Sequence, residues 1–276
     1  MIIIGLSLFL YPIISNKFNS LNYQRVIGNY SNTVEEITKQ EEMLNTAKNY
    51  NSSLIGTDIT DAFTDPNRTS SSEYLAILNV DNNGMIGYIS IPKIDVRIPI
   101  YHGTSSDILQ KGVGHLEGSS LPIGGESTHA ILSAHRGLPS SRLFTDLDQL
   151  KEGDIFYIYV LDEVLAYKVD QILVTEPEET EALKIVEGKD YVTLVTCTPY
   201  AVNTHRLLVR GERIEYNQNT LEDTVADLPL NNADLILYVS LIISILLIII
   251  VIIISINYKK KKKLHIKVIF DDDEII

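Results

Sequence analysis

Apolar residues change their spacing along the chain, and these changes divide it into segments. Between residues 16 and 50 they recur at a loose helical spacing, which predicts one or two amphipathic helices. Residues 51–73 lack periodicity and are rich in Ser, Thr, Asn and Asp, so we expect a long loop there. Loops of this length in compact proteins tend to be functional or disordered.

From residue 84 onward the pattern becomes that of short β-strands separated by Gly, Pro and Asp turns. Seven or eight such strands predict a mainly β fold, a closed or nearly closed barrel within residues 74–214. Short helices are expected at Ser105–Gly112 and Ser141–Leu147, and residues 215–234 form a polar tether. The strands are expected at Met85–Ile91, Val96–Ile100, His129–Ala134, Ile155–Val160, Leu165–Thr175, Val192–Thr196 and Leu207–Arg213.

An uncharged stretch near the C-terminus predicts a transmembrane helix. Leu235–Ile256 holds 22 residues, enough to cross a hydrocarbon core about 30 Å thick. The lysine run Lys259–Lys263 follows, and by the positive-inside rule it stays in the cytoplasm with the tail of residues 257–276. Contact of these lysines with anionic lipid agrees with the same orientation. The barrel is therefore expected outside the cell membrane.

The first 15 residues are also apolar, but they are short for a membrane span and lack the basic residues of a signal peptide. They are either an uncleaved anchor or a truncated signal. We expect a retained anchor, because no small-x-small cleavage site follows Ser15.

Composition excludes several function classes. A net charge of −13 argues against nucleic-acid binding, which needs clustered Lys and Arg. The single cysteine, Cys197, allows no intramolecular disulfide and no structural zinc site. A lone cysteine is more often a small buried hydrophobe than a nucleophile.

Cys197 nevertheless stands at the end of an apolar strand, directly before the turn Thr198-Pro199. A nucleophilic thiol needs a neighbouring base or cation. His135 also ends a predicted strand, so the two side chains can share one rim of the barrel. His265 lies beyond the predicted membrane helix. The residues alone leave open the alternatives His102, His115, His129 and His205.

A thiolate that attacks a carbonyl also needs a group that stabilises the oxyanion, commonly backbone N–H groups or an arginine. The last predicted strand offers Arg206 and Arg210. Strand alternation puts both on one face and cannot choose between them. A solvated strand face is the simpler explanation for both.

At this point the residues resemble a known family. Thr193 to Arg213, TLVTCTPYAVNTHRLLVRGER, resembles the signature of the class C, or pilin-polymerising, sortases of Gram-positive bacteria. His129 to Asp154, Gly87 to Ser105 and Gly112 to Ser127 resemble further segments of that class. The resemblance implies an eight-stranded sortase barrel. Its catalytic residues fall on Cys197, His135 and Arg206.

Class C sortases also have a lid upstream of the barrel, usually with an Asp-Pro-aromatic motif that occupies the active site. In this chain the lid segment is residues 51–73, and the match is Asp65-Pro66 with Asn67 in the aromatic position. We expect Asp65 to pair with Arg206. Phe63 is a candidate for the missing ring. The alternative is an unoccupied, mobile loop.

The resemblance implies a cysteine transpeptidase that cleaves an LPXTG-like sorting signal and joins it to a lysine of another pilin, with no metal or organic cofactor. His135 would act first as acid and then as base. The partners implied are pilins or surface proteins with sorting signals, and the membrane. One alternative is a sortase that anchors surface proteins to cell-wall peptide. Another is a non-enzymatic β-domain with an inert Cys197, whereas a papain-like peptidase has the opposite order of cysteine and histidine.

Overall fold

The structure is a computed structural model that describes residues 2–54, 59–65, 67–217, 253 and 256–258. Residues 2–13 belong to one compact unit and residues 14–217 to another. Nearly all of the predicted transmembrane helix, most of the tether and most of the tail lie outside the described residues. Within the part of the chain that is described, no helix is long and apolar enough to cross a membrane.

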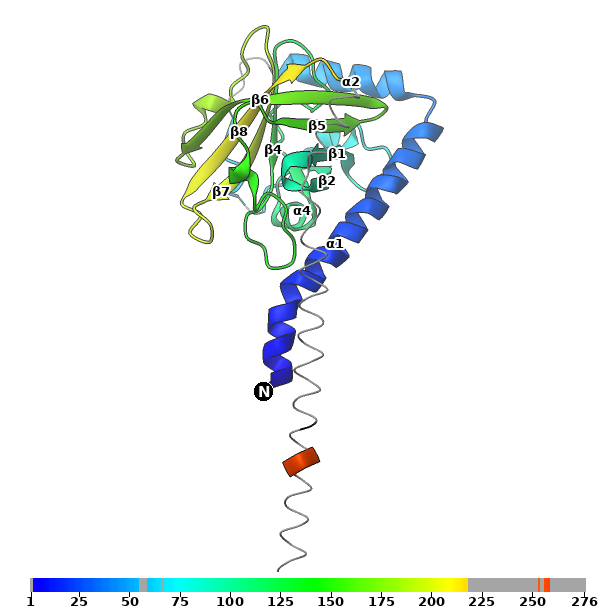
Figure 1. The fold of residues 1–276 in the computed structure, drawn as a ribbon. Helices are drawn as coiled ribbons and strands as arrows, with labels where there is room; N and C mark the ends of the chain where they lie inside the picture. The colour runs from blue at the N-terminus through cyan, green and yellow to red at the C-terminus, as the bar shows by residue number, and fades with distance from the viewer. Residues whose placement is uncertain (1, 55–58, 66, 218–252, 254–255, 259–276) are drawn as a thin grey trace, which may run out of the picture. The chain divides into compact units, whose positions relative to one another are not determined.

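Residues 14–217 contain a closed barrel of eight strands in the order β1-β2-β3-β4-β7-β8-β6-β5 (Figure 1). The predicted mainly β barrel is confirmed. The strands are β1 (Met85–Ile91), β2 (Val96–His102), β3 (Val113–His115), β4 (Thr128–Ser133), β5 (Ile155–Val160), β6 (Glu163–Thr175), β7 (Asp190–Thr198) and β8 (His205–Ile214).

The seven strands predicted by position are each found within three residues of the expected ends. The prediction missed β3, whose three residues include a glycine and are too few to show alternation. The helix expected at Ser105–Gly112 is α4 (Ser106–Lys111). The helix expected at Ser141–Leu147 is wrong: Leu143 has a φ of +41°, which a right-handed helix excludes, and only a 3₁₀ turn follows at Leu147–Gln149.

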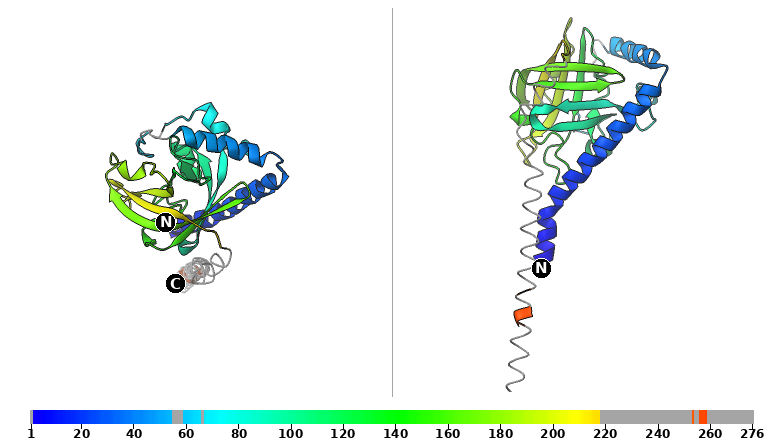
Figure 2. Two further views of the ribbon diagram at one scale, coloured as in Figure 1. Left: turned by 90° about the horizontal axis from the view of Figure 1, so that it is seen from above. Right: turned by 45° about the vertical axis from the view of Figure 1, so that its right-hand side comes forward.

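Three helices precede the barrel: α1 (Ile2–Glu36), α2 (Gln40–Ser53) and α3 (Ser72–Ala76). The helix α1 is continuous through Ser15, so no break in secondary structure separates the predicted anchor from the helical segment. From residue 14 onward it runs beside the barrel, and α2 lies across the barrel (Figure 2). The buried Tyr30 fixes α1, since its hydroxyl donates to Ile86 O (2.8 Å) and accepts from Leu161 N (2.9 Å).

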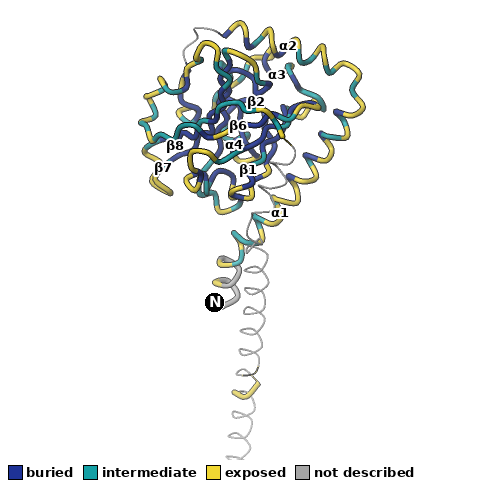
Figure 3. Tube along the Cα trace, turned by 45° about the horizontal axis from the view of Figure 1, so that its top comes forward, coloured by how far each residue is buried: buried dark blue, intermediate teal, exposed yellow. Residues whose placement is uncertain are grey.

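Apolar side chains form two clusters on opposite faces of the barrel wall. Alternation along β7 sends Val192 and Leu194 into the large interior core, and β1, β4 and β7 are buried along nearly their whole length (Figure 3). The smaller cluster covers the outer face of β4, β7 and β8 and includes part of the lid segment: Ile59, Ala62, Leu116, Ile131, Leu183, Val195 and Leu208. The outer face of these three strands is therefore covered by chain from before the barrel.

Candidate active site

The strands β4 and β7 bring the candidate nucleophile and base to one end of the barrel. They are parallel neighbours, with Ser133 in register with Val195. The pairing continues one residue further, where Ala134 N donates to Val195 O (3.1 Å). His135 follows two residues after the end of β4, at the level of Cys197 near the end of β7, and Cys197 shares the outer face with Val195. The thiol lies buried, not at an open rim, since Cys197 is only 8% exposed.

The pairing of β7 with β8 distinguishes the two arginines that alternation could not separate. Arg206 is the register partner of Cys197, whereas Arg210 is opposite Thr193, four residues earlier on β7. Arg210 is held by Asp170, with Nη2 at 2.7 Å from Oδ2. Arg206 is therefore the guanidinium beside the thiol.

The lid segment supplies the partner of Arg206, but from a different residue than predicted. The guanidinium donates from Nε to Asp61 Oδ1 (2.7 Å) and from Nη2 to Oδ2 (2.8 Å), and both side chains are buried. The prediction that Asp65 pairs with Arg206 is wrong. Asp65 is exposed and accepts a hydrogen bond from Asn67 N (3.0 Å), and Pro66 lies outside the described residues.

Phe63 supplies the aromatic ring. Its centroid lies 5.1 Å from Arg206 Cζ and 5.9 Å from the centre of the His135 ring. The sequence Asp61-Ala62-Phe63 thus places a carboxylate and a ring at the spacing of the Asp-Pro-aromatic motif, with Ala62 in the proline position. A search for an acid two residues before an aromatic ring would have found it. The search for an Asp-Pro dipeptide could not.

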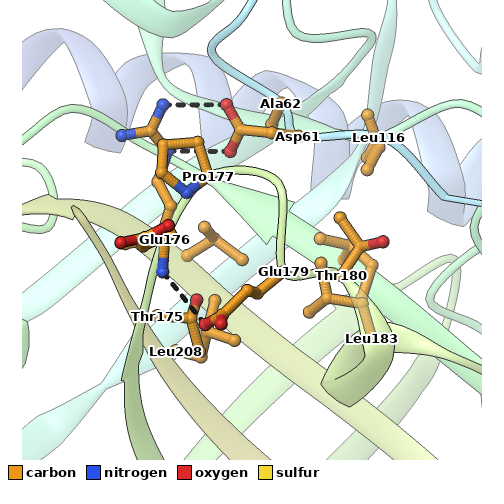
Figure 4. A pocket seen from close by; sticks show the side chains of 13 residues that line it. Asp61, Ala62, Leu116, Thr175, Glu176, Pro177, Glu179, Thr180, Leu183 and Leu208 are labelled. Carbon is orange, nitrogen blue, oxygen red and sulfur yellow. Dashed lines mark hydrogen bonds and ion pairs between the residues drawn. The ribbon is translucent and has the colours of Figure 1, made fainter. Parts of the chain in front are cut away.

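The same lid residues line a small pocket on the outer face (Figure 4). Asp61 and Ala62 form one side, and the loop from Thr175 to Leu183 forms the other. Apolar side chains of the barrel form the floor, namely Ile131, Val195 and Leu208. The lid therefore forms one wall of a pocket that also includes Arg206.

Burial favours the neutral form of both reactive groups. It raises the pKa of the Cys197 thiol; the positive charge of Arg206 lowers that pKa, and the carboxylate of Asp61 raises it again. Burial also lowers the pKa of His135. Both shifts favour the uncharged thiol and imidazole, and the guanidinium is already paired to a carboxylate.

The remaining histidines that the sequence left open lie in other environments. His102, His115 and His129 are buried in the barrel wall and hydrogen-bonded to main-chain carbonyls. Burial lowers the pKa of His115 to about 3 and that of His129 to about 4. His205 contacts the hydroxyl of Thr204 (2.8 Å). None of these four makes the ring contact with Phe63 that marks His135.

Comparison with known proteins identifies the family of the fold. Residues 89–214 match the sortase domain. The crystal structure of sortase C from Streptococcus pneumoniae, which concerns catalysis and pilin substrate specificity, is 52% identical, with a TM-score of 0.66, and the match covers 70% of this chain and 98% of that chain. Sortase C1 from Streptococcus agalactiae is 50% identical with a TM-score of 0.63, covering 70% and 100%.

Among curated proteins, sortase A of Streptococcus agalactiae serotype III is 34% identical over 135 residues, which is 48% of this chain. The chain spans 53% of the length of that relative. The two sortase C structures, in contrast, are matched over nearly their whole length. From the barrel, the thiol at its strand end and these matches, the chain belongs to class C of the sortase family, whose members are cysteine transpeptidases.

Proposed function

We propose that this chain polymerises pilins by transpeptidation. It cleaves an LPXTG-like sorting signal between Thr and Gly and transfers the threonyl carbonyl to a lysine amine of a neighbouring subunit. The observation that supports this most directly is the lid contact of Asp61 with Arg206 beside Cys197, together with the match to a sortase C whose structure was described for its pilin substrates.

The first step forms a thioester. With the lid displaced, the thiolate of Cys197 attacks the carbonyl carbon of the substrate threonine, and the carbonyl oxygen becomes an oxyanion. The intermediate collapses with cleavage of the Thr–Gly bond. His135, protonated by the thiol proton, donates that proton to the departing amine of glycine.

The second step reverses the roles. A lysine amine attacks the thioester carbonyl, His135 accepts the proton of the amine, and the Cys197 thiolate leaves. The product is an isopeptide bond between two subunits, and the thiolate regains the proton. The enzyme thus returns to its starting state with no change in oxidation state.

Arg206 is proposed to stabilise the oxyanion in both steps. Its register position opposite Cys197 puts a cation next to the attacking sulfur. A single oxyanion donor of this kind contributes about 3 kcal/mol in enzymes where it has been removed. Asp61 takes up an N–H group of Nε and one of Nη2, so these two donors become available to the oxyanion only when Asp61 leaves.

We also propose that the chain is held in the cell membrane with its barrel outside. The support is in the sequence: the uncharged stretch Leu235–Ile256 and the lysines that follow it. Labelling of single cysteines placed at Asn219 and Asp271, in a Cys197→Ala background and in intact cells, tests this orientation. Reagent that cannot cross the membrane should label only the first position.

The function is tested by incubating the full-length chain, wild type and Cys197→Ala, with a pilin subunit that has its sorting signal. A ladder of isopeptide-linked oligomers that disappears with Cys197→Ala is expected. Cleavage without a ladder would favour anchoring to cell-wall peptide. No product that depends on Cys197, even in an Asp61→Ala background, would overturn the transpeptidase proposal.

A further inference from the structure

The mechanism above does not use Arg136, the residue that follows the candidate base. Its side chain is only 9% exposed, although it is charged. The guanidinium contacts three places at once: Nε donates to Thr145 O (3.2 Å), Nη1 donates to Thr198 Oγ1 (3.0 Å), and Nη2 forms an ion pair with Asp148. Burial of a charge is costly unless it is paired and hydrogen-bonded, so this arrangement points to a specific role.

The contact with Thr198 joins the two halves of the active site. Thr198 follows Cys197 just as Arg136 follows His135. On the other side of His135 and Cys197, the preceding residues are also joined: Thr196 Oγ1 donates to Ala134 O (2.8 Å). The residues before and after the base therefore bond to the residues before and after the nucleophile.

His135 lies beyond the end of β4, and among the residues that the structure describes its own main chain makes no bond to β7; its carbonyl oxygen accepts a hydrogen bond from Phe144 N (3.2 Å). The last main-chain bond of the β4–β7 ladder is made by Ala134 N, and Arg136 is the next residue that bonds across to β7. Cys197, in contrast, lies within β7 and is paired with Arg206 on β8. The nucleophile is thus fixed by the ladder, whereas the base is at the start of a loop.

We propose that Arg136 is a positioning residue that holds the imidazole of His135 at the level of Cys197. It acts through Thr198 and the main chain at Thr145 and touches neither substrate nor the reacting atoms. Arginine suits this role because its planar guanidinium presents five donors in a fixed geometry. A lysine offers one charged centre and cannot reach the three acceptors together.

The same loop contains a matched control. Arg142 forms an ion pair with Asp146 but is 51% exposed, and its Nε and Nη2 both donate to that one aspartate. Arg142→Lys therefore tests the general effect of losing an arginine in this loop. Arg136→Lys tests the link to Thr198 while it keeps the charge.

We expect Arg136→Lys to lower kcat by about 10- to 100-fold with little change in KM, because small misplacements of a catalytic group have effects of this size. Arg142→Lys should stay within about twofold of the wild type. Thr198→Val, which removes the acceptor and keeps the side-chain shape, should reproduce most of the loss. In the double variant Arg136→Lys/Thr198→Val the two losses should not multiply.

The kcat measurement rests on the proposed function, so a second readout is independent of any pilin. In an Asp61→Ala background, the rate of alkylation of Cys197 by iodoacetamide should fall with Arg136→Lys toward the rate of His135→Ala, and the melting temperature should match that of Arg142→Lys. An inactive wild type with this fall would refute the proposed substrate and keep the positioning role. Alkylation and kcat equal to those of Arg142→Lys, or losses that multiply in the double variant, would overturn the inference.

Discussion

Two arginines on β8 have almost the same surroundings and yet differ in what they can do. Arg206 and Arg210 lie on one face of the strand, four residues apart. Each donates from Nε and Nη2 to an aspartate, and each guanidinium lies near an aromatic ring, at 5.1 Å for Phe63 and 4.2 Å for Tyr191. The chemistry of the two clusters is therefore the same.

The clusters differ in the origin of their partners. Asp170 and Tyr191 belong to β6 and β7, the two strands that flank β8, so the Arg210 cluster forms whenever the barrel forms. Asp61 and Phe63 precede the barrel, and in the described part of the chain they belong to none of its strands. The partners of Arg206 can therefore leave without disturbing the ladder, and a substrate can replace them.

The largest expected difference between the two arginines is in catalysis. In an Asp61→Ala background, which frees Arg206 from its carboxylate, Arg206→Ala should lower kcat by about 100-fold or more, and Arg210→Ala should have a much smaller effect. Steady-state transpeptidation of a sorting-signal peptide measures this. Equal losses in kcat from the two substitutions would mean that the register position opposite Cys197 gives Arg206 no special part in stabilising the oxyanion.

The second difference concerns the aspartates. Asp61→Ala should raise the rate of Cys197 alkylation by iodoacetamide by about 10- to 100-fold, since hydrogen bonds to charged groups contribute about 1.5–3 kcal/mol each and hold the lid segment on Arg206, the register partner of Cys197. Asp65→Ala is the matched control in the same segment and should leave the rate unchanged. An alkylation rate that rises equally in both variants would mean that the lid segment as a whole, and not the contact of Asp61 with Arg206, protects the Cys197 thiol.

The pH dependence of that reaction should move with the lid. Burial and the charge of Asp61 both raise the pKa of the Cys197 thiol. Loss of Asp61 removes one of these effects and lessens the other, so the thiol pKa falls and the alkylation midpoint shifts to lower pH. Asp65→Ala should leave the midpoint where it is in the wild type. A shift to higher pH would mean that Arg206 had moved away from the thiol together with the lid.

Local periodicity was enough to predict most of the barrel but not the lid contact. Strands such as Met85–Ile91 and Ile155–Val160 were predicted with their observed ends, because each has enough apolar residues to show the pattern. The bond between Asp61 and Arg206 joins residues 145 positions apart, and no local pattern encodes such a contact. The lid aspartate was misassigned because Ala62 stands where the motif has proline.

The part of the candidate site that lies at strand ends could be predicted from the sequence. Cys197 and His135 each end an apolar run, and parallel neighbours present such ends together. Alternation could not separate Arg206 from Arg210, because the choice depends on the register of β7 with β8. The family resemblance selected Arg206. Arg136 gave no sequence signal, since its role depends on Thr198, which lies 62 residues away.

Asp170→Ala should show the opposite behaviour to Asp61→Ala. Arg210 is 18% exposed and would lose its carboxylate within the barrel wall, so we expect the free energy of unfolding to fall by about 1–2 kcal/mol. The rate of Cys197 alkylation should not rise. Urea unfolding and iodoacetamide labelling of the same samples measure both. A faster alkylation with Asp170→Ala would mean that the Arg210 cluster also restrains the lid.

The smallest effect is expected from the aromatic rings. A cation–π contact contributes about 0.5–1 kcal/mol where it is partly exposed, so Phe63→Leu should speed Cys197 alkylation only about two- to fivefold, below the effect of Asp61→Ala. Tyr191→Leu is its counterpart over Arg210 and should lower stability without changing the alkylation rate. If Phe63→Leu exceeded Asp61→Ala, the ring over His135 and Arg206, and not the carboxylate, would be the main restraint. The two clusters would then differ in chemistry as well as in the origin of their partners.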